Sequence, residues 1–96
     1  MAIKSFKHKG LKELFCSGDS SGIQAKHKNK VLKVLDRLHA AKQPKDMDLP
    51  GYRLHSYRGS KKGEPKTWSV DVNGNWRITF IFVGEDVEVV DYIDPH

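Results

Sequence analysis

The stretch WSVDVNGNWRITFIF, residues 68–82, decides the fold expected for this chain. On both sides of Asn73-Gly74-Asn75, apolar side chains alternate with polar ones, the pattern of strands that bury one face. An Asn-Gly step between two such runs indicates a hairpin. We expect a three-residue loop at residues 73–75, because that length puts the apolar side chains of both strands on one face. A two-residue loop would put them on opposite faces. With the longer loop, Arg77 points to the other face.

Residues 84–96 are expected to complete the sheet. Gly84-Glu85 is followed by another apolar run toward the C-terminus, so three strands would form an antiparallel meander. If this turn closes the second hairpin, Arg77 lies across from Tyr92. Asp94 and His96 then lie on that same face, near the end of the strand. The pattern predicts that an arginine, a tyrosine, an aspartate and a terminal histidine share one surface.

The first half of the chain predicts helices. Apolar residues recur at helical spacing within residues 31–41, namely Val31, Val34, Leu35, Leu38 and Ala41. Around them we expect a short strand at 3–6, a helix at 8–15 and a strand at 52–58. The histidines of the helical part are expected at the surface or at an interface, namely His8, His27 and His39. Helices followed by a meander indicate one α+β domain over residues 1–96, with the N-terminal strand and the helices packed on one face of an antiparallel sheet.

The charge of the chain is unevenly distributed. The net charge is +5, yet residues 1–66 hold 16 Lys/Arg and 6 Asp/Glu, whereas residues 67–96 hold 1 and 6. The first part therefore carries +10 and the second −5. A strongly basic region indicates a polyanionic partner such as RNA. The alternative is an ordinary solvated surface of lysine-rich helices.

Several classes of protein are disfavoured by the sequence. No apolar run approaches the roughly 20 residues that cross a bilayer, and the N-terminus lacks a secretory pattern, so we expect a cytoplasmic protein without membrane contact. Cys16 is the single cysteine, which excludes an internal disulfide and a cysteine-rich metal site. There is no glycine-rich phosphate loop, serine-nucleophile motif or metal-ligand spacing, so no cofactor is expected.

The remaining histidine, arginine, lysine and tyrosine residues suit RNA cleavage without a metal. That reaction needs a base for the ribose 2′-hydroxyl, an acid for the leaving 5′-oxygen and a cation for the charge on phosphorus. His96 could serve as base or acid, because Asp94 and its own α-carboxylate favour the charged ring. Arg77 could grip the phosphate. The alternatives are a frayed terminal histidine and a surface arginine paired with Asp71 or Asp91.

A second group of candidates lies before and within the polar loop at residues 59–65. His55 and Arg58 fall on the strand expected just before it, and Lys61 and Lys62 lie in the loop, where they could bind phosphates. A solvated edge strand is the alternative for the first two. Tyr92 could stack on a base, although half-buried packing is more usual for a strand tyrosine.

Motifs along nearly the whole chain resemble HigB toxins of the RelE superfamily. The opening at residues 3–12 is similar to theirs, as are Trp68-Ser69-Val70 and the Asn-Trp-Arg-Ile-x-Phe run at residues 75–80. The C-terminal Asp91-Tyr92 and Asp94-Pro95-His96 also resemble the family. The resemblance implies a microbial-RNase-like α+β fold and ribosome-dependent cleavage of mRNA in the A site. It further implies a helix-turn-helix antitoxin of the HigA type, with operator DNA bound only through the antitoxin complex.

The resemblance also implies roles for individual residues. His55 matches an active-site histidine of the family, Arg58 stands where relatives usually have lysine, and Arg77 matches their phosphate-gripping arginine. Either Asp91-Tyr92, with Ile93 where many relatives have histidine, or Asp94-Pro95-His96 could complete the site. Two other functions stay open: a non-catalytic RNA- or ribosome-binding module, and an inactivated toxin that acts with its antitoxin in autorepression.

Overall fold

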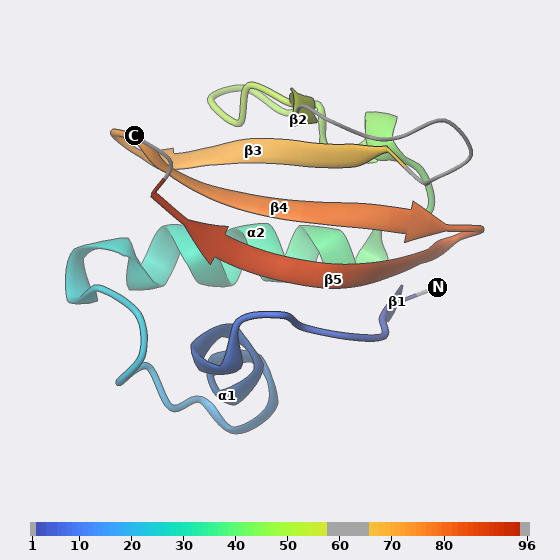
Figure 1. Ribbon diagram of the computed structural model, residues 1–96. Helices are drawn as coiled ribbons and strands as arrows, with labels where there is room; N and C mark the ends of the chain where they lie inside the picture. Colours follow the sequence, from blue (N-terminus) through green and yellow to red (C-terminus); the bar gives the residue numbers. More distant parts are fainter. Residues whose placement is uncertain (1, 58–65, 95–96) are drawn as a thin grey trace.

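The computed structural model describes residues 2–57 and 66–94, which form one α+β domain. Figure 1 shows the helix α2 behind a sheet whose opposite face is turned to the viewer. The elements are β1 (Ala2–Ile3), α1 (Lys9–Ser17), η1 (Ala25–His27), α2 (Lys28–Ala40), η2 (Pro44–Met47), β2 (His55–Tyr57), β3 (Thr67–Asn73), β4 (Trp76–Val83) and β5 (Asp86–Ile93). The expected fold class is confirmed. Within the described residues, no helix is long and apolar enough to cross a membrane.

The described strands form one sheet in the order β1-β5-β4-β3-β2. Strands β2 to β5 are an antiparallel meander, as the sequence predicts, and β1 adds a parallel edge to β5. Phe6 extends that edge through an isolated bridge to Val90. The N-terminal segment is thus attached to the last strand, and Lys7 follows directly with its N–H donating to the carbonyl of Val90 at 2.9 Å.

The helices form where the apolar residues repeat. In α2 the buried residues are Val31, Val34, Leu35 and Leu38, so the predicted stripe is the face that packs on the sheet. In α1, Leu11 and Leu14 are buried. This helix ends at Gly18, whose φ of 79° lets its N–H bond to the carbonyl of Leu14 at 3.0 Å.

The first hairpin has the expected common apolar face, although its turn is shorter than expected. Only Gly74 and Asn75 connect β3 to β4, so the prediction of a three-residue loop is wrong. A register shift between Asp71 and Asn73 inserts the extra residue into the strand instead. The two-residue turn alone would place the apolar side chains of β3 and β4 on opposite faces of the sheet. The extra residue of the bulge returns them to one face, so Val70 still pairs with Ile78 on the buried face.

A second bulge, in β5, changes which face of the sheet the later side chains of this strand point to. Ile81 pairs with Glu88 and Thr79 pairs with Asp91, so two residues of β5 stand opposite one residue of β4. Consequently Ile93, and not Tyr92, lies across from Arg77. The predicted Arg77–Tyr92 pairing is therefore wrong.

The bulge also separates the residues expected to share one surface. Tyr92 pairs with Ile78 and is 4% exposed, on the face that the helices cover. Asp91 lies on the opposite face, together with Arg77 and Thr79. Because of the bulge in β5, Arg77 shares its face of the sheet with Asp91 and not with Tyr92.

Candidate functional site

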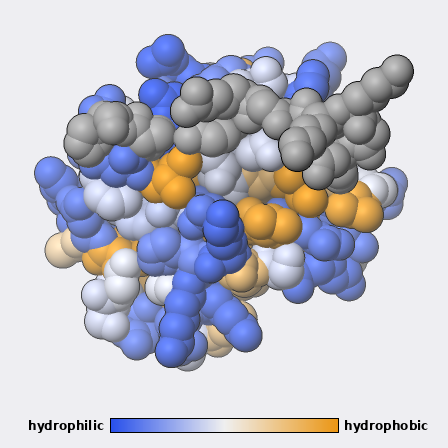
Figure 2. Space-filling view, in the orientation of Figure 1, coloured by the Kyte–Doolittle hydropathy of each residue, from blue (hydrophilic) through white to orange (hydrophobic). Residues whose placement is uncertain are grey.

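The sheet face opposite α2 is lined by polar side chains. They alternate along the strands with the core residues and come from β2 to β5, namely His55, Ser69, Asp71, Arg77, Thr79 and Asp91. In the view of Figure 2, hydrophobic patches lie beside hydrophilic side chains on this face. An antiparallel sheet can leave one face polar, and polar groups gathered beside apolar side chains are suited to a polar ligand.

Two polar atoms of this face are buried without a partner among the described residues. They are Oγ of Ser69, whose residue is fully buried, and Nε of Arg77. Leaving a buried donor or acceptor unpaired costs about 1–3 kcal/mol. Such groups point to a ligand that supplies the missing hydrogen bonds.

Four residues of this face form a closed ring of contacts. Nη1 of Arg77 lies 3.2 Å from Nε2 of His55 and 3.4 Å from Oδ1 of Asp71. The other carboxylate oxygen of Asp71 lies 3.2 Å from Nη1 of Arg53, and the Arg53 carbonyl lies 2.6 Å from Nδ1 of His55. Each member therefore restrains its neighbours, and Arg77 and His55 are held side by side.

The two contacts of the His55 ring match one of its tautomers. A backbone carbonyl only accepts and a guanidinium only donates, so Nδ1 carries the hydrogen that is donated to Arg53 and Nε2 accepts from Arg77. In this tautomer the lone pair of Nε2 is directed at the arginine. A neutral imidazole with an accepting nitrogen is the form that can remove a proton.

The ring itself carries net positive charge. Asp71 is shared between Arg53 and Arg77, so one carboxylate balances two guanidiniums. Arg53 is mostly exposed, whereas the side chain of Arg77 is three-quarters covered. Because partial burial strengthens electrostatic interactions, an anion on this face would interact most strongly with Arg77.

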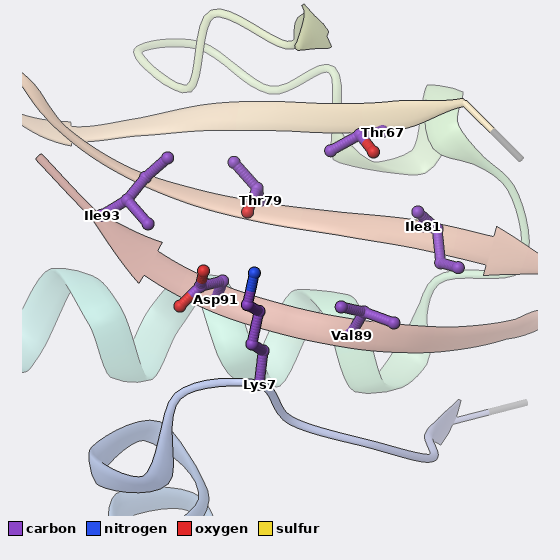
Figure 3. A pocket seen from close by; sticks show the side chains of 7 residues that line it. All are labelled: Lys7, Thr67, Thr79, Ile81, Val89, Asp91 and Ile93. Carbon is purple, nitrogen blue, oxygen red and sulfur yellow. The ribbon is translucent and has the colours of Figure 1, made fainter. Parts of the chain in front are cut away.

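A hollow of about 380 Å³ continues this face toward β5. Figure 3 shows Lys7 reaching up from the segment before α1, with its amine between the side chains of Thr79 and Asp91. The hollow is lined by Lys7, Thr67, Thr79, Ile81, Val89, Asp91 and Ile93. It combines a cation, a carboxylate and hydroxyl groups with apolar side chains.

Tyr92 belongs to an interior cluster on the other side of the sheet. Its hydroxyl lies 2.5 Å from Nδ1 of His27, and its ring stacks on Trp76 at 4.5 Å between centroids. Burial raises the pKa of Tyr92, and the charge of Asp94 adds to this, while a hydrogen bond with the Gln24 backbone opposes it. The hydroxyl thus stays protonated and engaged with His27.

The expectation that His27 is a surface residue is wrong. It is 1% exposed, and burial, with a smaller contribution from Lys26, lowers its pKa. Its position four residues before Val31 extends the apolar stripe of α2 by one turn, and this spacing could have predicted its burial.

The structure brings together part of the predicted site. His55 and Arg77 are in contact, and Asp91 lies on the same face. Tyr92 lies on the opposite face, and Asp94 is half-buried just beyond β5. Four predicted residues lie outside the described residues, namely Arg58, Lys61, Lys62 and His96.

Arg53 and Lys7 are members of this face that the sequence did not indicate. Arg53 has a φ of 51°, which turns its carbonyl toward His55. A left-handed arginine after Gly51 has no sequence signature. Lys7 reaches the hollow only because its backbone is hydrogen-bonded to β5.

Comparison with known proteins identifies the family of this chain. A family model described as RelE-like toxin of type II toxin-antitoxin system HigB matches residues 4–96. The chain is also 39% identical over 94 residues to "Endoribonuclease HigB" of Proteus vulgaris, an alignment that covers 98% of this chain and 99% of the relative. The resemblance drawn from the motifs is thereby confirmed. The chain belongs to the HigB-like toxins, the RelE-like toxins of type II toxin–antitoxin systems.

Proposed function

We propose that this toxin is an endoribonuclease that cleaves mRNA in the ribosomal A site and so inhibits translation. The observation that supports cleavage is the contact between Arg77 and His55 on the sheet face opposite α2. The relative named as an endoribonuclease, aligned over almost the full length, supports the same activity.

The proposed reaction is transfer of the phosphate to the neighbouring ribose hydroxyl. The 2′-oxygen attacks phosphorus, the bond from phosphorus to the 5′-oxygen breaks, and a cyclic phosphate and a 5′-hydroxyl remain. Nε2 of His55 takes the 2′-hydroxyl proton once Arg77 has turned its hydrogen bond to the phosphate. Arg77 stabilises the charge that develops on the phosphate oxygens.

The remaining roles follow from the sequence and the contacts. His96 donates the proton to the leaving 5′-oxygen, because Asp94 favours its charged form. The phosphate-binding residues are Arg58, Lys61 and Lys62, with Asp91 as a further RNA contact. Tyr92, whose hydroxyl is bonded to His27, acts as a positioning residue for β5. Base, acid and cation are thus all side chains, and the proposed reaction needs no metal.

The proposed partners are the programmed ribosome and a helix-turn-helix antitoxin of the HigA type, with operator DNA bound through the antitoxin complex. Membership of a toxin–antitoxin family supports an antitoxin partner. Exposed lysines of α2, including Lys28 and Lys33, support contact with ribosomal RNA, because phosphate contacts by lysine dominate such binding.

The test uses purified full-length protein, a defined mRNA, and 5′-end mapping with and without ribosomes. New 5′-hydroxyl ends are expected only with ribosomes, and Arg77→Ala is expected to abolish them. Lys42→Ala, which removes an exposed charge outside the site, is expected to cleave like the wild type. Translation arrest with every transcript intact would overturn the nuclease and leave a non-catalytic ribosome-binding module.

A further inference from the structure

We propose that the hollow between Lys7 and Asp91 is a nucleotide subsite beside the scissile phosphate. In it, Lys7 binds an RNA phosphate and Asp91 accepts hydrogen bonds from the N–H groups of one base. The inference rests on the proposed function and extends it from cleavage to recognition of the neighbouring nucleotide.

The hollow adjoins the ring of Arg53, His55, Asp71 and Arg77 along the same strands. Ile93, one of its lining residues, stands directly opposite Arg77, and Thr79 is two residues from Arg77 on the same face. Two residues of a strand span about 6.6 Å, so a nucleotide next to a phosphate held by Arg77 reaches the hollow without passing another element.

Lys7 is held where its amine can meet a phosphate. Its backbone N–H is anchored to the carbonyl of Val90, while its exposed side chain extends over β5 into the hollow. Within residues 2–57 and 66–94, neither Lys7 nor Asp91 forms a salt bridge. Oδ1 of Asp91 accepts from the Tyr92 N–H at 2.9 Å, which leaves the other carboxylate oxygen for a ligand. The cation and the carboxylate face one hollow without pairing with each other, so each can contact a different part of a nucleotide.

The conformation of Val89 is independent evidence for the importance of Asp91. Val89 has a φ of 55°. This backbone conformation is strained for a β-branched residue and costs on the order of 1–3 kcal/mol. The hydroxyl of Ser5 accepts from the Val89 N–H at 2.9 Å, and the Ser5 carbonyl accepts from the Val90 N–H at 3.2 Å. This strained bulge is what directs Asp91 to the hollow, and strain of this kind concentrates at functional sites.

The lining indicates which nucleotides fit. Apolar side chains of Ile81, Val89 and Ile93 can contact the face of a base, and about 380 Å³ lies within the usual range for small-ligand sites. The carboxylate of Asp91 only accepts hydrogen bonds. It therefore favours bases with an exocyclic amino group, which are adenine, cytosine and guanine, over uracil, whose single Watson–Crick N–H is flanked by two carbonyl oxygens that repel a carboxylate.

The test is a titration of the full-length protein with short oligoribonucleotides whose reacting ribose is 2′-deoxy, so that they bind without being cleaved. Backbone amide shifts of Thr79, Ile81 and Asp91 report binding in the hollow. Lys7→Gln is expected to weaken binding about tenfold, equivalent to roughly 1.4 kcal/mol. Lys9→Gln, which removes an exposed charge two residues away and outside the hollow, is expected to change binding less than twofold.

Base recognition is tested with oligonucleotides that differ only at the nucleotide next to the deoxyribose. The wild type is expected to bind the amino-bearing bases more tightly than uracil, and Asp91→Asn is expected to remove that preference. Equal weakening by Lys7→Gln and Lys9→Gln, or amide shifts that avoid the hollow, would overturn the subsite. If the subsite is overturned in this way but the protein still cleaves mRNA on ribosomes, the proposed function stands without the subsite. If the oligonucleotides bind in the hollow but no mRNA is cleaved, the subsite stands without the nuclease.

Discussion

At the scale of single residues, the shape of the guanidinium distinguishes Arg77 from a lysine at the same position. One nitrogen contacts both His55 and Asp71, which leaves the rest of the planar fork for a substrate. Lysine would keep the charge but would present it as a point at the end of a flexible chain. The geometry of the ring therefore matters as much as its charge.

Arg77→Lys is accordingly expected to lower the rate of mRNA cleavage on the order of 10²-fold, the usual effect of removing one donor that stabilises transition-state charge. The measurement is the single-turnover cleavage rate on programmed ribosomes, with thermal melting as a control for folding. A variant that folds and cleaves at the wild-type rate would show that the fork is not used.

Only part of this ring of contacts could be predicted from the sequence. The resemblance identified His55 and Arg77, because both lie in motifs of the family. It did not identify Arg53, which joins through a backbone carbonyl in a left-handed conformation. Contacts that depend on a backbone angle are set by the surrounding structure and leave no residue pattern.

At the scale of elements, the alternation of apolar residues predicted the buried faces of β3 and β4 but not that of β5. The reason is the bulge at Val89, which is held by Ser5 from the far end of the chain. Alternation alone would place Val87, Val89 and Asp91 on one face. A tertiary contact therefore overrides the local pattern at the residues that build the hollow.

Val89→Gly is expected to relieve the strain at that bulge. Glycine adopts a positive φ without steric cost, so the free energy of unfolding is expected to rise by up to about 1 kcal/mol, less the small loss of partly buried apolar surface. Chemical denaturation of both proteins measures the difference. Val83→Gly is the matched control, because Val83 is similarly exposed without a positive φ, and it is expected to destabilise the strand.

The approach of α1 to the loop before η1 depends on two glycines. A Cβ on Gly22 would lie 2.9 Å from Cα of Gly10, a backbone atom that cannot move aside alone. Gly22→Ala is expected to cost about 1–3 kcal/mol of stability, the usual effect of overpacking, in the same denaturation assay. Gln24→Ala, at an exposed position nearby, is expected to have a smaller effect, and equal effects would contradict the contact.

At the scale of the whole molecule, a buried polar contact joins the two layers beneath the candidate site. His27, at the start of α2, contacts Tyr92 on β5, and both rings lie against Trp76 on β4. The candidate site and this cluster therefore occupy opposite sides of the same strands. Strand β5 carries Tyr92 of the cluster and, one residue earlier, Asp91 on the other face.

Acidification is expected to destabilise the fold through His27. Burial lowers its folded-state pKa below the ordinary value of about 6.5, so between those two values the unfolded chain binds more protons and stability falls with falling pH. A single group contributes at most about 1.4 kcal/mol per pH unit. The charged groups around it are Lys26, and Asp94 beyond Tyr92, so the buried ring has no carboxylate contact among the described residues.

The substitution His27→Asn places a side-chain amide where Nδ1 of His27 contacts the Tyr92 hydroxyl, and this amide does not titrate. The free energy of unfolding of the variant is therefore expected to fall less steeply than that of the wild type below about pH 6.5. Urea denaturation of the wild type and the variant across that range gives the two slopes, and the carboxylates common to both cancel in the difference. His39→Asn, at an exposed position on the same helix, is expected to keep the wild-type slope. Parallel curves for the wild type and His27→Asn would mean that this histidine is not what makes the fold acid-sensitive, and that the layers separate in acid for another reason.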